Sequence, residues 1–303
     1  MAPVSTVAAV VVTYNRKDKL PKVLDHVLAQ TQRPDLLVIV DNASTDGTDE
    51  VLRRYEGTDG VVLVRLDENT GGAGGFATGM NKAYEQGADF VWIMDDDCYP
   101  NPDALEELLN GLAKAEETMG MQLPFACSLV KWVDGSICEM NNPVTTWDWG
   151  RLISKGQEAV LVQHCSFVSV LFPRWALTKH GLPLREYFIW FDDQEYTLRL
   201  TRSSGPGVQV LSSTVVHDLG VNRGVNFSDV NASNMWKFEY GARNEASFRL
   251  HHENPVAFAK FVVRVHQGLK QGHVPLGLRV KLMKKIVEGV KFNPKPDMPR
   301  SVL

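Results

Sequence analysis

The chain has 303 residues, 44% of them hydrophobic and 22% charged, and its formal net charge is −4. This composition is typical of a globular protein with one large α/β core or two modest domains, and the negative balance excludes a nucleic-acid partner at the level of the whole chain. No run reaches the roughly 18 apolar residues of a membrane-spanning helix, and the N-terminus lacks the layout of a signal peptide. The four cysteines have neither the spacing of a zinc site nor that of a CxxC motif. We therefore expect a cytoplasmic protein with reduced thiols.

Strands and helices alternate four times in the first hundred residues. Apolar runs predict buried strands over residues 7–13, 36–40, 61–66 and 90–94. Helical spacing of apolar residues follows the first strand, Thr48 is placed to cap a helix after the second, and a helix from about Ala77 to Glu85 follows the third. This alternation predicts a doubly wound, Rossmann-like and mostly parallel sheet with helices on both faces.

Polar residues follow each of these four strands. They are Thr13 to Asn15, Asp41 with Asn42, the glycine-rich stretch 69–75, and Asp95 to Asp97. Ligands of doubly wound sheets bind beyond the carboxyl ends of the strands. All four polar clusters are therefore expected at one edge of the sheet.

The three carboxylates Asp95, Asp96 and Asp97 come directly after the fourth strand. Acids at the exit of a buried strand repel one another unless a positive charge lies among them. A hard divalent cation bound by oxygen ligands is the usual partner, and it keeps open positions for phosphate oxygens. The alternative is a solvated acidic turn before the helix that follows Pro102.

The second half of the chain has shorter apolar pieces. Strands are expected over residues 160–172 and 207–216, the latter followed by His217. Asp192 and Asp193 precede a helix that begins near Gln194. They are candidates for reactive groups and for caps of that helix, and one can cap while the other reacts.

The last fifty residues are basic. Apolar residues recur four apart between Leu276 and Phe292, which predicts a basic amphipathic helix. Such a helix either lies on an anionic membrane surface or packs on the core with its lysines in solvent. An exposed tail of this kind also suits the interface of a homo-oligomer.

With these motifs in order, the chain resembles inverting nucleotide-sugar glycosyltransferases of the GT-A fold, family 2. The resemblance rests on residues 10–16, 40–46, 95–97 and 191–195 and on the region of His217. It implies a GT-A domain over residues 1–250, with a nucleotide-sugar half at 1–125 and an acceptor half at 126–250. Residues 251–303 would then form the basic helical C-terminal region.

Within the family, the stretch from Asn69 to Phe76 is similar to enzymes that transfer rhamnose or galactofuranose. Chain length, the motif from Trp190 to Asp193 and the basic tail are most similar to actinobacterial galactofuranosyltransferases of cell-wall galactan (arabinogalactan) assembly, in particular the initiating enzyme. This implies UDP-galactofuranose as donor and a polyprenyl-diphosphate-linked rhamnosyl-GlcNAc acceptor, with dTDP-rhamnose as the alternative donor. It also implies peripheral association with the inner face of the cell membrane.

The resemblance assigns roles to individual residues. Asp95, Asp97 and His217 would bind Mn²⁺ or Mg²⁺, and the histidine would favour Mn²⁺, although a lone histidine is more often structural. Asp193 would be the base that takes the acceptor proton, with Asp192 next. The acceptor would lie near Arg243 and Asn244. The nucleotide sugar would bind to Thr13, Asn15, Arg16, Asp41, Asn69, Gly71, Gly72, Gly74, Gly75, Asp95, Asp96 and Trp190.

A different class of enzyme remains open from the sequence. The spacing of Gly72, Gly74 and Ala77 after a strand, with Asp95 roughly 20 residues further on, is also that of a dinucleotide-dependent oxidoreductase. Against it, this element is the third of the sheet, and Asp95 belongs to an acidic triplet. Binding of NADH, compared with metal-dependent binding of UDP, separates the two.

Overall fold

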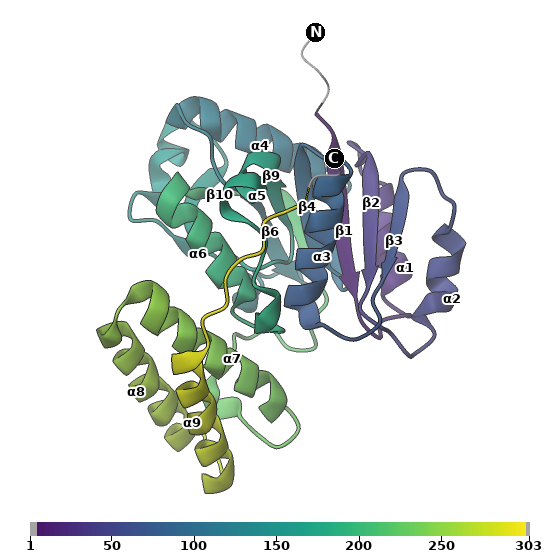
Figure 1. Ribbon diagram of the computed structural model, residues 1–303. Coiled ribbons are helices and arrows are strands. Elements are labelled where there is room, and N and C mark those ends of the chain that lie inside the picture. Colours follow the sequence, from purple (N-terminus) through teal and green to yellow (C-terminus); the bar gives the residue numbers. More distant parts are fainter. Residues whose placement is uncertain (1–4, 301–303) are drawn as a thin grey trace.

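The first apolar run forms β1 (Val7–Thr13), a fully buried strand of a ten-stranded sheet in the computed structural model, which describes residues 5–300 (Figure 1). The strand order is β3-β2-β1-β4-β9-β6-β10-β8-β7, and β5 pairs with β10. The other strands are β2 (Leu36–Asp41), β3 (Val61–Arg65), β4 (Phe90–Asp95), β5 (Cys98–Pro100), β6 (Ala126–Trp132), β7 (Val144–Thr145), β8 (Ala159–His164), β9 (Val170–Pro173) and β10 (Gly207–His217).

The N-terminal half of the sheet is parallel. The chain runs outward from β1 to β2 and β3 and then returns to β4 on the other side of β1. Val12 lies opposite Asp95, and Thr13 lies opposite Asp41. The strand order therefore reverses between β1 and β4, where doubly wound sheets bind their ligands.

The C-terminal half of the sheet is mixed, because β9 is antiparallel to β4 and β6, and β8 is antiparallel to β10, whereas β6 and β10 are parallel. The single strand expected over residues 160–172 is two strands. The chain leaves β8 at His164 and enters β9 at Val170, elsewhere in the sheet. The segment between them carries Ser166 and Phe167 to the cavity described below.

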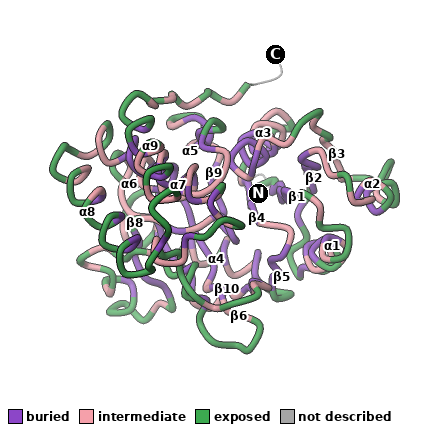
Figure 2. The backbone as a smooth tube through the Cα atoms, turned by 90° about the horizontal axis from the view of Figure 1, so that it is seen from below, coloured by how far each residue is buried: buried purple, intermediate pink, exposed green. Residues whose placement is uncertain are grey.

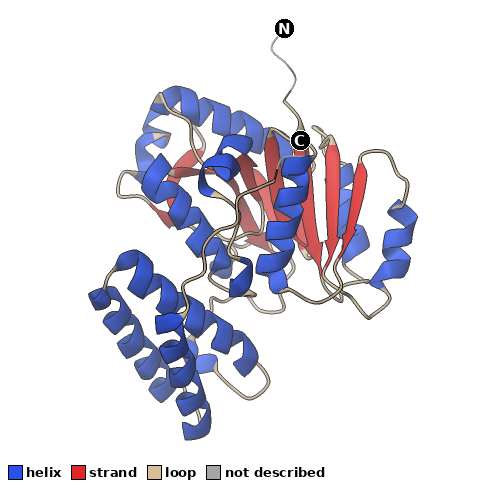
Figure 3. Cartoon of the chain, in the orientation of Figure 1, coloured by secondary structure: helices blue, strands red, loops and turns tan. Residues whose placement is uncertain are grey.

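Helices cover both faces of the sheet, as the sequence predicts (Figures 2 and 3). Alternate residues of β1 belong to two hydrophobic clusters, one on each face of the sheet. Val11 packs in the cluster that contains residues of α1, α2 and α4, and Val10 packs in the cluster that contains residues of α3, α5 and α6. The α/β fold with a mostly parallel N-terminal half is thus confirmed. These helices are α1 (Leu20–Leu28), α2 (Thr48–Leu52), α3 (Gly71–Glu85), α4 (Ala104–Met119), α5 (Arg174–His180) and α6 (Asp192–Ser204).

Two local predictions were wrong. Thr48 is the first residue of α2 and not its cap; its hydroxyl donates to Asp46 (2.6 Å), and Gly47 precedes the helix with a φ of 93°. The helix expected from Ala77 begins at Gly71, so the glycine run is helical. A Cβ on Gly75 would lie 2.4 Å from Val12 Cγ1, so the missing side chain lets α3 approach β1 closely.

A separate group of helices lies below the sheet in Figure 1: α7 (Met235–Phe248), α8 (Pro255–Gln271) and α9 (Leu276–Lys291). They share a hydrophobic cluster that includes Phe238, Phe261, Leu282 and Ile286. The division of the chain at residue 250 stays a prediction; by its packing, α7 belongs with α8 and α9. Among residues 5–300, no helix is both long and apolar enough to cross a membrane.

The segment after α9 runs back across the sheet domain to α3, and we call residues 292–300 the return segment (Figure 1, yellow). The carbonyl of Asp297 accepts a hydrogen bond from Leu182 N (2.8 Å), and its carboxylate pairs with Arg185 (3.2 Å). Arg300 N donates to Asn81 Oδ1 of α3 (2.9 Å). The helical group is therefore attached to the sheet domain at both of its ends.

Candidate active site

A cavity of about 830 Å³ lies between the carboxyl ends of the central strands and the C-terminal helices. Acidic residues and His217 line it on the sheet side, whereas Lys237, Glu245, Arg264 and Gln267 line it from α7 and α8. Of the four polar clusters predicted to converge, Asp95 to Asp97 and Gly72 of the glycine-rich stretch line the cavity. His217, at the end of β10, lines it too, and the helical group supplies the opposite wall.

Asp95, Asp97 and His217 lie together at one end of this cavity. Each offers a ligand atom, and the three atoms lie within 4.8 Å of one another. Asp95 ends β4, His217 ends β10, and the two strand ends are joined by a hydrogen bond from Asp218 N to the carbonyl of Asp97 (2.9 Å). Two carboxylates and an imidazole form a donor set that suits Mn²⁺.

Asn141 fixes the orientation of the His217 ring. His217 Nδ1 lies 2.8 Å from Asn141 Oδ1, and Nε2 lies 3.1 Å from Asp97 Oδ1. Because an amide oxygen only accepts, the proton at this contact belongs to Nδ1. Nε2 therefore points at the acids, as in metal-binding histidines whose other nitrogen is held by the protein.

The acids perturb one another's pKa values. Burial, and then the charge of Asp97, raises the pKa of Asp95 to about 8. Burial likewise raises the pKa of Asp96 to about 6. For Asp97, the hydrogen bond and charge of His217 and the charge of Arg16 outweigh burial and lower the pKa. Arg16 lies 3.6 Å from Asp96 and 3.8 Å from Asp97, so the protein itself supplies part of the positive charge that the triplet requires.

Asp192 and Asp193 face the triplet from the first turn of α6. Burial raises the pKa of Asp193 to about 6, and burial together with the charge of Asp193 raises that of Asp192 well above its usual range. Neither side chain caps the helix, since Phe191 occupies the capping position and Asp193 Oδ1 accepts only from Gln194 N (2.7 Å). The capping interpretation is therefore wrong, and both carboxyls are free to face a substrate.

The residues expected to bind the nucleotide sugar separate into three groups. Arg16, Gly72 and Trp190 line the cavity, as do Asp95 and Asp96.

Three others lie at the ends of β1 and β2, beside the cavity and not on its lining. Asn15 Oδ1 accepts from Thr45 N (2.7 Å), Asp41 Oδ1 accepts from Ser44 N (3.0 Å), and the buried Thr13 hydroxyl has no hydrogen-bond partner among the described residues. Their roles in donor binding stay predictions.

The third group consists of packing residues. A Cβ on Gly71 would lie 2.0 Å from the carbonyl of Phe188, and one on Gly74 would lie 2.4 Å from Thr70. Gly75 packs on β1 as described, and Asn69 accepts from Gly71 N (2.8 Å). These glycines permit close packing of α3, so contact of Gly71, Gly74 and Gly75 with the donor is not supported.

The expected acceptor residues lie elsewhere. Asn244 is fully buried, and Arg243 donates to Asn244 Oδ1 (2.9 Å) and to the carbonyl of Glu186 (2.7 Å). Neither residue lines the cavity, so the geometry gives no support to a place near the acceptor, which stays a prediction. The lining residues of α7 and α8, and Asn141 and Ser166, were not predicted, because no motif in the sequence marks these segments.

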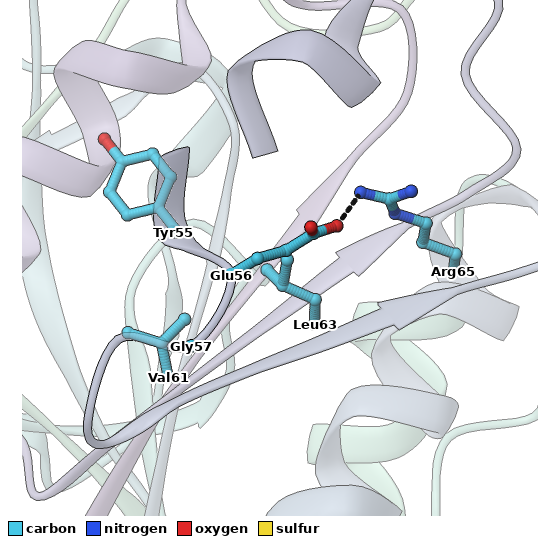
Figure 4. Close-up of a pocket in the computed structure, with 6 residues that line it drawn as sticks. All are labelled: Tyr55, Glu56, Gly57, Val61, Leu63 and Arg65. Carbon is cyan, nitrogen blue, oxygen red and sulfur yellow. Dashed lines mark hydrogen bonds and ion pairs between the residues drawn. The ribbon is translucent and has the colours of Figure 1, made fainter. Parts of the chain in front are cut away.

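A second hollow, of about 420 Å³, lies at the far edge of the sheet outside β3 (Figure 4). It is lined by Tyr55, Val61 and Leu63 and by the ion pair between Arg65 and Glu56 (2.7 Å). It contains no cluster of acids, and the chemistry is therefore assigned to the large cavity.

Comparison with known proteins decides the family. GlfT1, a galactofuranosyltransferase of Mycobacterium tuberculosis, is 35% identical over 230 residues, which cover 71% of each chain. The sequence model of "Glycosyl transferase family 2" matches residues 8–146. The chain belongs to glycosyl transferase family 2. GlfT1 of Mycolicibacterium smegmatis is 30% identical to this glycosyltransferase over 237 residues, 73% of this chain and 74% of the relative.

The fold agrees with this assignment. Residues 1–349 of TarS from S. aureus superpose with a TM-score of 0.58 at 20% identity, covering 94% of this chain and 81% of that one. The prediction of the GT-A fold is thereby confirmed, and the family assignment confirms that of a glycosyltransferase. The oxidoreductase alternative is wrong, because the family is one of glycosyltransferases.

Proposed function

We propose that this family 2 glycosyltransferase transfers galactofuranose, with inversion, from UDP-galactofuranose to a polyprenyl-diphosphate-linked rhamnosyl-GlcNAc acceptor in cell-wall galactan synthesis. The main support is the similarity to two mycobacterial galactofuranosyltransferases over more than two thirds of the chain. The cavity supports the same reaction, since it places a cluster of metal-ligand type opposite a pair of buried carboxyls.

In this proposal Asp95, Asp97 and His217 hold Mn²⁺ or Mg²⁺. The residues fit a cation, because their ligand atoms converge within 4.8 Å and the contact of His217 Nδ1 with Asn141 leaves Nε2 facing the acids. A divalent cation at this position neutralises the charge that develops on a leaving nucleoside diphosphate. Arg16 lies beside the same acids and assists by its own charge.

The proposed base is Asp193, which removes the proton from the attacking acceptor hydroxyl. With a pKa of about 6, Asp193 is largely ionised at neutral pH, whereas burial and the charge of Asp193 raise the pKa of Asp192 well above its usual range. A group that accepts a proton must first be ionised, so the electrostatics favour Asp193. Trp190 and Phe191 precede the pair on the wall of the cavity and exclude water from it.

A donor panel tests the proposal. The protein is incubated with Mn²⁺ and either UDP-galactofuranose, UDP-galactopyranose or dTDP-rhamnose, and release of nucleoside diphosphate is measured with and without a polyprenyl-linked rhamnosyl-GlcNAc. We expect UDP release from UDP-galactofuranose only, accelerated by the acceptor. Turnover of dTDP-rhamnose instead would make this a rhamnosyltransferase, and release that the acceptor does not change would contradict the acceptor assignment.

We further propose that α9 binds an anionic membrane surface. Its Leu282 and Ile286 pack against α7, which confirms the packing interpretation for one face. On the opposite face Val280, Lys284, Val287 and Lys291 follow at spacings of three and four residues and are exposed. An apolar and basic stripe of this kind suits a bilayer interface.

Replacing Val280 and Val287 with serine should reduce binding to phosphatidylglycerol-containing vesicles roughly tenfold, because two partly inserted valines are lost. Co-sedimentation at low and high salt measures this. The double variant Val133→Ser and Val144→Ser, which changes two exposed valines far along the chain from α9, serves as the control. Binding indifferent to both the valines and the salt would show that α9 is only a packing element.

A further inference from the structure

The loop that carries the carboxyl pair into the cavity has an unusual backbone. Phe188, Trp190 and Phe191 all have positive φ values, of 64°, 64° and 72°. Residues with a side chain rarely adopt this conformation, and it persists only where surrounding groups enforce it. Asp192 and Asp193 follow directly, so the position of the proposed base depends on whatever holds this loop.

Asn244 of α7 holds the loop from one side. Its Nδ2 donates to the carbonyls of Tyr187 (2.8 Å), Trp190 (2.9 Å) and Ile189 (3.2 Å). Its Oδ1 accepts from Arg243 Nε (3.1 Å) and Nη2 (2.9 Å). Because a guanidinium only donates and a carbonyl only accepts, this is the one orientation of the amide that satisfies every partner.

Further contacts converge on the same loop. Ala73 N, in the first turn of α3, donates to the carbonyl of Phe188 (3.1 Å). The Phe188 ring stacks on Tyr240 at 4.6 Å, and the Trp190 ring meets Phe238 edge-on at 4.9 Å. The loop thus lies between α3 and α7, and Asn244 is the residue whose side chain binds three of its carbonyls.

We infer that Asn244 is a positioning residue, which keeps Phe188, Trp190 and Phe191 at positive φ and thereby sets Asp192 and Asp193 toward the metal-ligand cluster. The inference rests on the proposed function in so far as Asp193 is the base. It explains why an amide is buried in α7 with no access to the cavity. It also gives the helical group a role in the chemistry of the sheet domain.

The test compares Asn244→Ala with Ser247→Ala. Both residues are fully buried in α7 and both donate to a backbone carbonyl, but Ser247 donates to Phe292 in the return segment, whereas Asn244 donates to the loop carbonyls. We expect Asn244→Ala to lower kcat about 100-fold, as misplacement of a reacting group by roughly 1 Å does. The affinity for Mn²⁺ should stay within about twofold, because the cation site is not part of the loop. Ser247→Ala should leave kcat within about threefold, whatever its effect on thermal stability.

Hydrogen–deuterium exchange supplies a readout that does not depend on turnover. Amides of residues 185–195 should exchange faster in Asn244→Ala than in the wild type. Their exchange rates should be unchanged in Ser247→Ala. Arg243→Gln removes the guanidinium that donates to Asn244 Oδ1 but keeps Asn244 itself. This variant should show the same increase in exchange to a smaller extent, and it replaces Asn244→Ala in the test if that variant does not fold. Unchanged exchange in this segment, or an equal loss of kcat in both α7 variants, overturns the inference. If the wild type turns over no sugar nucleotide in the panel, the proposed function fails and the exchange result alone decides the role of Asn244.

Discussion

Asp193→Asn should lower sugar transfer by at least about 100-fold, because general-base catalysis contributes roughly 10²–10⁴ to a rate. Asparagine keeps the shape of the side chain and its Oδ1 can still accept from Gln194 N, so α6 should begin as before. Binding of UDP with Mn²⁺ should be unchanged, since the expected metal ligands lie on β4 and β10. Steady-state kinetics and isothermal titration calorimetry measure the two effects separately.

The same variant should be more stable than the wild type at neutral pH. The pKa of Asp193 rises from 3.8 to about 6 on folding, chiefly through burial. Stability associated with the protonated carboxyl is present below pH 4 and is lost as pH rises through about 6. Asp193→Asn removes this loss, so its free energy of unfolding at pH 7.5 should exceed that of the wild type by roughly 1–3 kcal/mol. The difference should disappear near pH 4, and urea unfolding at both pH values measures it.

Asp192→Asn is the matched control for the base. Burial and the neighbouring charge raise the pKa of Asp192 well above its usual range, and asparagine resembles a protonated carboxyl, so this variant should retain most of the transfer activity. In the wild type, transfer should decline below about pH 6, as Asp193 takes up a proton. If Asp192→Asn is inactive and Asp193→Asn is active, the assignment of the base is reversed.

Asp95→Asn should abolish metal-dependent turnover. It removes one of the two carboxylates whose oxygens converge with His217, so the affinity for Mn²⁺ should fall steeply. Added Mn²⁺ at about 100 times its wild-type dissociation constant should stabilise the wild type by roughly 2.7 kcal/mol, and this gain should vanish in the variant. Thermal unfolding with and without Mn²⁺ measures the gain directly, without reference to donor or acceptor.

Asp67→Asn, which changes an exposed acid in the loop after β3, serves as the control for net charge. It should keep both the stabilisation by Mn²⁺ and the turnover. Full activity of Asp95→Asn, or equal stabilisation of all three proteins by Mn²⁺, would show that the acidic triplet is not a cation site.

The local pattern of the sequence was sufficient for the parallel half of the fold. Strands that are buried on both faces are continuous apolar runs, so β1, β2, β3 and β4 were predicted to within one or two residues. The mixed half was harder, because pairing between distant segments such as β4 and β9 leaves no periodic signal. The split of residues 160–172 into two strands depends on that pairing.

The site shows the same contrast between local and long-range information. Asp95, Asp97 and His217 were predicted from motifs, and the structure brings them together. The glycine run is part of α3, where Gly71 and Gly75 pack closely against Phe188 and Val12 while Gly72 lines the cavity, and the sequence alone does not distinguish these two uses of glycine. Asn244 was expected near the acceptor. Its amide instead donates to carbonyls of a loop more than fifty residues earlier, and no sequence pattern reveals such long-range hydrogen bonds.

The return segment has a mechanical consequence. The helical group leaves the sheet domain after β10 and is fastened again through Asp297 and Arg300, which bind the segment after α5 and helix α3. Two separate attachments restrict rotation of the helical group relative to the sheet domain. We therefore expect α7 and α8 to form a fixed wall of the cavity and not a hinged lid. Substrates should then enter and leave the cavity without movement of these helices.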